Sequence, residues 1–300
     1  MFQNVKPPLT YEEQIKRFKE FHNLLIDDDE EALLILKKIN YYRLSGYGNG
    51  LTLPNDKDKY RPGISLKHLY QLYTFDSKMK NLLSLVIEQI EIQFRANISY
   101  HLATNYGSLG YLDPNNFADR TDANGNSVLG RILYDFNTMV ERNKRLPFVQ
   151  HHIINYDGKF PIWAAVELFT FGNLTSLYSI MQNKDKDAIA KLYGTKDVYF
   201  NSWIRLLQEV RNVCAHYARL YNFTLKITSR LHKEYDFLMS NARTKKTKLF
   251  HVLIVLKKVL DNEQWNEFYS QFKLLLNEYL PYVRLGFMSF PENWEEILEK

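Results

Sequence analysis

The sequence comprises 300 residues, 45% hydrophobic and 15% aromatic, which is enough apolar material for a packed core and argues against disorder. Its single cysteine, Cys214, excludes an intramolecular disulfide framework and fits a reducing compartment. No stretch has the length and apolar character of a signal-peptide core or a membrane span, so we expect a cytoplasmic protein without a membrane partner. The net charge of +5 permits a polyanionic partner such as RNA without demanding one.

Long stretches of helical periodicity, with few of strand alternation, predict an all-α fold. Asp27, Asp28 and Asp29 precede the segment EEALLILKKIN, whose acidic start and basic end favour a helix. We interpret the three aspartates as a helix cap, with a metal site as the minor alternative, because they lack nearby histidines or spaced ligands. Residues 41–63 predict turns and a short hairpin.

One long helix is predicted from Ser65 to about Tyr106, where apolar residues recur at three- and four-residue steps. A break near Phe75 and Asp76 is left open. Residues 107–128, rich in Gly, Asn and Asp, predict a long surface loop. We interpret the basic run ARTKKTK, 242–248, as a solvated loop, with a phosphate-contacting patch as the alternative. Further helices are expected near 129–144, 161–183, 185–193, 199–221, 245–261 and 263–280.

The segment from Trp203 to Tyr221 concentrates chemically useful side chains on one predicted helix. At about 100° per residue, its large apolar residues and Cys214 share one broad face. The opposite face carries a narrow polar stripe, on which Asn212 and His216 are one turn apart. The stripe consists of Arg205, Glu209, Asn212, His216 and Arg219.

Arg211 lies off this stripe, roughly 140° around an ideal helix from His216. Two arrangements could bring them together: the Arg211 side chain curls around, or two copies of the helix meet at a two-fold axis. The plain alternative is a surface helix in which Arg211 pairs with Glu88 or Glu91 of a neighbouring helix. Spacing alone does not decide, because Arg95 and His101 compete with a similar pattern.

The segment RNVCAHYARLYN, residues 211–222, resembles the RNxCAHxxRLxN signature of the Abi family of bacterial abortive-infection proteins, within the HEPN superfamily of helical ribonucleases. Other blocks resemble the family in the same order, so the resemblance covers nearly the whole chain. These blocks are YYRLSGY at 41–47, LYTFDSKMKNLLSLVIEQIEIQFR at 72–95, PIWAAVELFTFGNLTSLY at 161–178 and GFMSFPENW at 286–294.

The resemblance implies a HEPN-like helical bundle with additional N-terminal and C-terminal helices and a long surface loop. It implies a single domain over 1–300, with an N-terminal extension at 1–63 and a helical core at 64–300. It further implies a homodimer whose two motifs form one metal-independent endoribonuclease site without a cofactor. Tyr217 stands where many relatives carry a second histidine, and Phe223 where many carry an arginine, so details of substrate choice do not carry over.

Carried over by position, the catalytic residues are Arg211, Asn212 and His216. We expect His216 to act as general base or acid, Arg211 to hold the scissile phosphate, and Asn212 to orient one of them. Cys214, on the apolar face, is interpreted as core and not as a nucleophile. Five further residues are candidates for substrate binding or for supporting the site: Arg219, Arg205, Glu88, Glu91 and Arg95.

The sequence thus leads to the hypothesis of a growth-arresting ribonuclease of phage defence that acts on RNA. Its expected partner is a second copy of the chain, and an RNA or protein antitoxin is a further candidate partner. Two alternatives stay open at this stage. One is a non-catalytic helical module that binds RNA or a partner toxin with the same basic residues. The other is a purely structural helical protein, in which Arg211 and His216 would be buried and fully paired.

Overall fold

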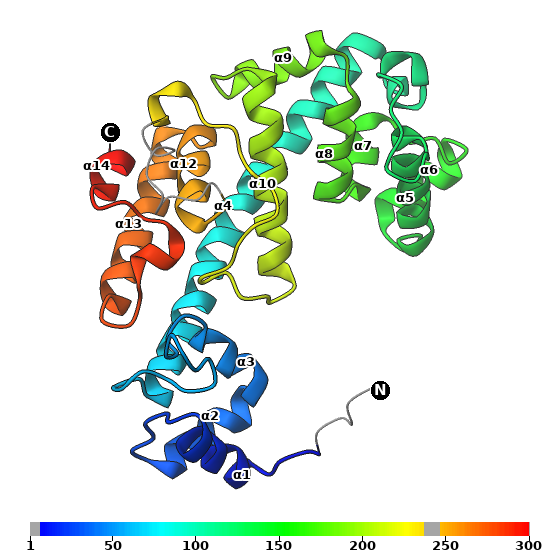
Figure 1. The fold of residues 1–300 in the computed structure, drawn as a ribbon. Coiled ribbons are helices and arrows are strands. Elements are labelled where there is room, and N and C mark those ends of the chain that lie inside the picture. Colours follow the sequence, from blue (N-terminus) through cyan, green and yellow to red (C-terminus); the bar gives the residue numbers. More distant parts are fainter. Residues whose placement is uncertain (1–6, 237–246, 300) are drawn as a thin grey trace. The chain divides into compact units, whose positions relative to one another are not determined.

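Helices supply the regular structure of residues 7–236 and 247–299, which are the residues that the computed structural model describes (Figure 1). Among them no strand forms, and extended backbone pairs only at isolated bridges such as the one between Thr52 and Tyr60. The predicted all-α fold is therefore confirmed. The chain divides into two units, and whether it behaves as a single domain stays a prediction.

Unit 1 consists of Met1–Leu82, Arg219–Phe223 and Tyr269–Met288. Its first helices are capped by side chains: Thr10 and Glu13 form a reciprocal capping box, and the Asp28 carboxylate accepts hydrogen bonds from the N–H groups of Glu30 and Glu31. The acidic run therefore acts as the predicted cap. The helices of this part are α1 (Tyr11–Lys16), α2 (Asp29–Lys38), α3 (Tyr41–Ser45) and the start of α4 (Leu66–Tyr106).

A short hairpin-like loop connects α3 to α4, as residues 41–63 predict. Its two sides are joined by the hydrogen bonds Leu53 N–H to Lys59 O and Arg61 N–H to Leu51 O, at 2.8 and 3.0 Å. Gly50, with φ +87°, takes a left-handed conformation that suits glycine. The loop thus folds back without forming a strand.

α4 runs without a break through Phe75 and Asp76, so the open alternative at that point is wrong. Asp76 is only 1% exposed and accepts hydrogen bonds from the Tyr47 hydroxyl at 2.7 Å and from the N–H groups of Leu220 and Tyr221 at 3.0 and 2.6 Å. Its carboxylate also lies 3.1 Å from the Lys80 ammonium. A residue that favours turns is tolerated inside the helix because its side chain is fully occupied elsewhere.

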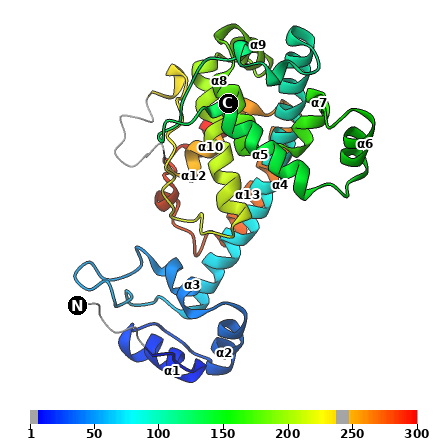
Figure 2. The ribbon, with the colours of Figure 1, turned by 90° about the vertical axis from the view of Figure 1, so that its right-hand side faces the viewer.

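Unit 2 consists of Leu83–Ala218, Thr224–Phe268 and Ser289–Lys300. The second half of α4 lies beside α8, α9 and α10 (Figures 1 and 2), and the ring of Phe94 on α4 packs edge-on against Tyr178 and Phe200. The helices after α4 are α5 (Val128–Arg142), α6 (Pro147–Asn155), α7 (Ile162–Ala165), α8 (Phe171–Ile180), α9 (Asn183–Leu192), α10 (Asp197–Ala215), α12 (Leu249–Val259), α13 (Asn262–Tyr279) and α14 (Trp294–Glu299).

The single helix predicted for 161–183 is wrong. The chain forms α7, leaves the helical conformation at Phe169 and begins again as α8. Thr170 starts α8, since its hydroxyl accepts from the Asn173 N–H while the Asn173 side chain accepts from the Thr170 N–H, at 3.1 and 3.0 Å. The surrounding apolar residues hide this cap in the sequence.

The remaining predicted helices are confirmed except at their ends, and α6 was not expected. The predicted loop 107–128 contains two short helical turns, Gly110–Leu112 and Pro114–Asn116, but no longer element. α12 contacts both α10 and α14, and the Lys257 ammonium donates to the carbonyls of Ile297 and Leu298 near the end of α14. Residues 242–246 of the basic run 242–248 lie outside the described residues, so neither interpretation of that run is tested.

Candidate active site at the end of α10

α10 is held in unit 2 by an apolar face that is almost completely buried. Trp203 packs within this face, and its indole Nε1–H donates a hydrogen bond to the Arg230 carbonyl at 2.6 Å. Cys214 belongs to this face and is buried, which confirms its interpretation as a core residue. The buried residues of the face are Phe200, Trp203, Ile204, Leu206, Leu207, Val210 and Cys214. A helix packed in this way presents its other residues in fixed positions.

The chain after α10 returns along the helix without forming a regular element before residue 233. Glu209 accepts hydrogen bonds from the N–H groups of Lys226 and Ile227 at 2.7 and 2.8 Å, and Ser202 accepts from the Arg230 N–H at 2.9 Å. Glu209 of the predicted polar stripe therefore has a structural task. It anchors the returning segment instead of facing a substrate.

α10 ends at Ala215, so the prediction of a helix to residue 221 is wrong. His216 is the capping residue, and Tyr217 adopts φ +53°, a left-handed conformation. The N–H of Tyr217 bonds to Cys214 O and that of Ala218 to Val213 O, both at 3.0 Å, which is the Schellman pattern of a terminated helix. Glycine usually marks this position, and its absence explains why the sequence showed no stop.

Arg211 is oriented by an acidic residue of α4. Its Nε lies 3.7 Å from Glu91 Oε2, and the two side chains are 44% and 14% exposed. The other oxygen of Glu91 accepts from Arg95 Nη2 at 3.0 Å, and Arg95 Nη1 donates to the Phe169 carbonyl at 3.0 Å. Glu91 is therefore shared between a well-packed arginine and a more exposed one. The pairing proposed in the plain alternative is present, yet Arg211 keeps much of its surface exposed.

Asn212 and His216 are one helical turn apart at the end of α10, and the backbone N–H of His216 bonds to the Asn212 carbonyl at 3.0 Å. The His216 side chain is exposed and Asn212 is half-buried. Within residues 7–236 and 247–299, neither side chain takes part in a hydrogen bond or ion pair, and none joins Arg211 to His216. These three residues are therefore neighbours on the helix end without forming a closed internal network.

The other candidates are dispersed. Glu88 and Arg205 are exposed, and no ion pair reaches either of them within the described part of the chain. Arg219 is not on α10 at all, since it follows the Schellman turn and belongs to unit 1. Of the five supporting candidates, only Glu91 forms an ion pair with Arg211. Arg95 is connected to Arg211 indirectly, because it pairs with the same Glu91 carboxylate.

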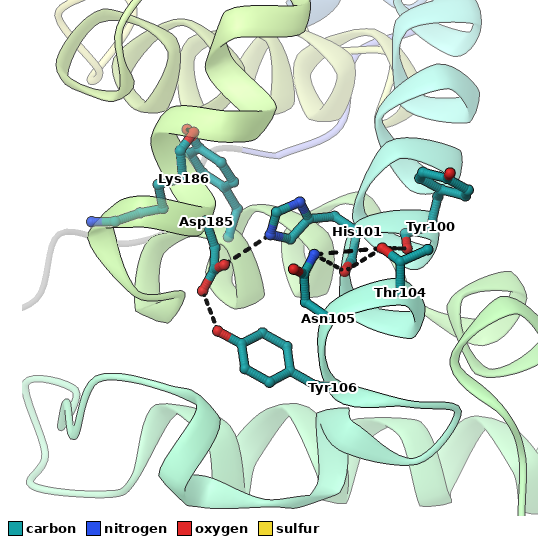
Figure 3. A network of polar contacts seen from close by, with 8 residues as sticks. Tyr100, His101, Thr104, Asn105, Tyr106, Asp185 and Lys186 are labelled. Carbon is teal, nitrogen blue, oxygen red and sulfur yellow. Dashed lines mark hydrogen bonds and ion pairs between the residues drawn. The ribbon is translucent and has the colours of Figure 1, made fainter.

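Arg95 and His101, the competing pair in the sequence, do not form one site: Arg95 binds Glu91, whereas His101 belongs to a separate structural network (Figure 3). His101 Nε2 lies 2.8 Å from the buried Asp185 Oδ1, and the Tyr106 hydroxyl donates to Asp185 Oδ2 at 2.6 Å. Burial and the neighbouring Asp185 charge raise the pKa of Tyr106 to about 12, so it stays a donor. The network joins the end of α4 to α9, and its signal in the sequence is weak because Asp185 lies 84 residues from His101.

Comparison with known proteins adds the family. A model of the family described as Abi-like protein matches residues 34–222, which include α3, α4 and the whole of α10. No curated protein and no solved structure matches the chain. In the part of the chain that the structure describes, no helix is long and apolar enough to cross a membrane. Because the matched region covers well over half of its length, the chain belongs to the Abi-like protein family, which suggests a role in abortive-infection phage defence.

Proposed function

We propose that this protein is a metal-independent endoribonuclease of abortive infection, with its site at the end of α10. The observation that carries the proposal is the state of His216. Its imidazole is exposed and unpaired among the described residues, one turn after Asn212 and five residues after an arginine that Glu91 holds. A histidine that served only the fold would be buried and hydrogen-bonded to the core.

The residues suit the chemistry of RNA cleavage by the ribose 2'-hydroxyl. An imidazole can take the proton from the hydroxyl or give one to the departing 5'-oxygen. A guanidinium group is always charged and matches two phosphate oxygens, so Arg211 would stabilise the negative charge of the phosphorane. Asn212 would orient the imidazole or the phosphate by a hydrogen bond. The expected products are a 2',3'-cyclic phosphate and a 5'-hydroxyl.

A second copy of the chain is part of the proposal. Acid and base catalysis on the two sides of one phosphate needs two proton-transfer groups, and the α10 end of one chain offers a single histidine. Two α10 ends related by a two-fold axis would supply two histidines and two arginines to one phosphate. This geometry accounts for the offset between Arg211 and His216 on the helix.

The test compares the wild type with Arg211→Ala and His216→Ala, each purified and incubated with RNA in EDTA. We expect each variant to lose about 10²- to 10⁴-fold in cleavage rate, with growth arrest on expression lost in parallel. Lys191→Ala, which removes an exposed cation of α9, serves as the control and should cut RNA like the wild type. Wild type that binds RNA but never cuts it would overturn the enzymatic proposal in favour of a binding module.

Mixing the two inactive variants tests the shared site. A mixed dimer of Arg211→Ala and His216→Ala supplies one of the two histidines and one of the two arginines to the shared site, so its cleavage should stay below that of the wild type but exceed that of either variant alone. Failure to regain activity, together with a monomer by light scattering, would show that one chain carries the whole site.

A further inference from the structure

A second basic site lies in unit 1, at the loop between α3 and α4. A cleft of about 570 Å³ opens there between the hairpin-like loop and Arg219. Its volume falls within the range of roughly 300–1,000 Å³ typical of small-ligand sites. All of its lining residues belong to unit 1, so the cleft is distinct from the end of α10.

The charges that line the cleft are unbalanced. Lys57, Arg61 and Arg219 face a single acidic residue, Asp58. No ion pair reaches any of these three cations among residues 7–236 and 247–299. A half-buried guanidinium group without a carboxylate partner, such as that of Arg219, gains most from an anion that enters from solution.

The wall of the cleft holds its cations in place. Arg61 Nε donates to the Thr52 carbonyl at 2.9 Å, which leaves its terminal nitrogens for a ligand. Gly46 lies against the guanidinium of Arg219, since a Cβ at this glycine would be 3.9 Å from Arg219 Nη1. Arg61 is thus held by a hydrogen bond to the loop backbone, and the guanidinium of Arg219 lies beside a glycine.

The histidine of the cleft plays a different part. Its two ring nitrogens are both engaged, Nδ1 with the Asp58 carbonyl and Nε2 with the Tyr41 hydroxyl at 2.8 Å. His22 therefore fixes the loop and is not an additional ligand. The recognition chemistry that remains is that of two guanidinium groups and one ammonium group, which is the chemistry of phosphate binding.

We propose that this cleft binds the phosphodiester backbone of the RNA strand; the inference rests on the proposed function. Arg219 follows His216 by three residues, so the chain leads directly from the candidate catalytic histidine to the cleft. Several cations in one cleft can each bind a successive phosphate of a strand, whereas a ligand with a single carboxylate would occupy only one of them. The contact is with phosphate and not with bases, so it contributes affinity without choosing a sequence.

The test measures how RNA affinity depends on salt. The probe is a fluorescent single-stranded RNA with 2'-O-methyl groups, which lacks the attacking hydroxyl and stays intact. Each phosphate contact contributes about 0.7 to the slope of log affinity against log salt for a single strand. We expect Lys57→Gln, Arg61→Gln and Arg219→Gln each to reduce the slope by about 0.7, and the triple variant by about 2. Lys67→Gln, an exposed lysine of the same unit outside the cleft, should leave it unchanged.

The outcomes separate this inference from the proposed function. If the wild type cuts RNA and the triple variant keeps the wild-type slope, the cleft inference fails and the ribonuclease stands. If the slope depends on the cleft but cleavage is never seen, the cleft stands and the ribonuclease fails. A third outcome would overturn the inference and identify a small-anion site. In it, inorganic phosphate or a mononucleotide displaces the RNA at the concentration at which each binds alone, and the variants show no change in slope.

Discussion

The Asp76 carboxylate, in the first third of α4, accepts a 2.6 Å hydrogen bond from the backbone N–H of Tyr221, 145 residues later. This bond attaches the segment that follows the α10 turn to the start of the long helix. Since the carboxylate also accepts from Leu220 and Tyr47 and pairs with the buried Lys80, it satisfies four groups at once.

Asp76→Asn should therefore be strongly destabilising. An amide replaces one acceptor oxygen by a donor that faces the Tyr47 hydroxyl or the Lys80 ammonium, and the buried ammonium loses its counter-charge. We expect the free energy of unfolding to fall by about 3–5 kcal/mol, measured by urea denaturation. Glu278→Gln, which breaks an exposed ion pair with Lys78 in the same unit, is the control and should cost far less. Equal losses in the two variants would contradict the central role of Asp76.

Glu91 and Glu88 offer a matched pair on the same helix. Glu91 is shielded and pairs with two arginines, whereas Glu88 is exposed and unpaired among the described residues. Glu91→Gln should lower the free energy of unfolding by about 1–3 kcal/mol and slow RNA cleavage about tenfold, because Arg211 loses its orientation. Glu88→Gln should leave both quantities at the wild-type value. A normal cleavage rate in Glu91→Gln would show that Arg211 needs no partner.

Tyr217 allows the backbone at the α10 turn to be tested by itself. Its left-handed conformation disfavours any residue with a Cβ, and the residue is 72% exposed. Tyr217→Gly should consequently be more stable than Tyr217→Ala by about 1 kcal/mol, whereas glycine is the less stable of the two inside a helix. Thermal unfolding of both variants shows which of the two is the more stable. If alanine proves the more stable, the turn does not persist in solution.

His232 gives a dependence of stability on pH. Burial lowers its pKa below the ordinary value of about 6.5, the Lys258 charge lowers it further, and Glu234 partly opposes the shift. Between the lowered and the ordinary pKa the unfolded chain holds a proton that the folded protein lacks. The contribution of His232 is therefore complete above about pH 6.5 and is lost as the pH falls through this window.

His232→Gln should flatten this dependence. The quantity to compare is the free energy of unfolding of wild type and variant from about pH 7.5 to about pH 5, where the difference should shrink with acidification. Burial also lowers the pKa of His68, but His68 is present in both proteins, so its contribution cancels in the difference between wild type and variant. A difference that stays constant over this range would mean that His232 titrates alike in both states.

The sequence predicted elements well where local periodicity decides. The apolar stripe of α4 predicted both ends of this helix to within one residue of those in the structure, because a continuous apolar face has to be buried along its whole length. Prediction failed at two helix boundaries that the sequence does not mark clearly. Tyr217 ends α10 in a position that glycine normally marks, and Thr170 starts a new helix inside an apolar run.

The candidate site was predictable in part for a similar reason. The neighbourhood of Asn212 and His216 follows from helical spacing, and Glu91 was one of two acidic partners considered for Arg211. Arg219 was misplaced on the polar stripe, because the prediction assumed a helix from Trp203 to Tyr221, whereas α10 ends at Ala215. The cleft in unit 1 could not be foreseen, since it depends on how a loop near residue 50 packs against a residue more than 150 positions later.

The returning segment after α10 has a consequence for where this protein can be shortened. The family match stops at Asn222, yet Trp203, Ser202 and Glu209 find their hydrogen-bond partners between residues 226 and 230. A chain cut at the end of the match would leave an indole N–H and a carboxylate on α10 without these partners. The smallest piece that keeps all of these hydrogen bonds of α10 therefore extends beyond the region matched by the family model, at least to Arg230.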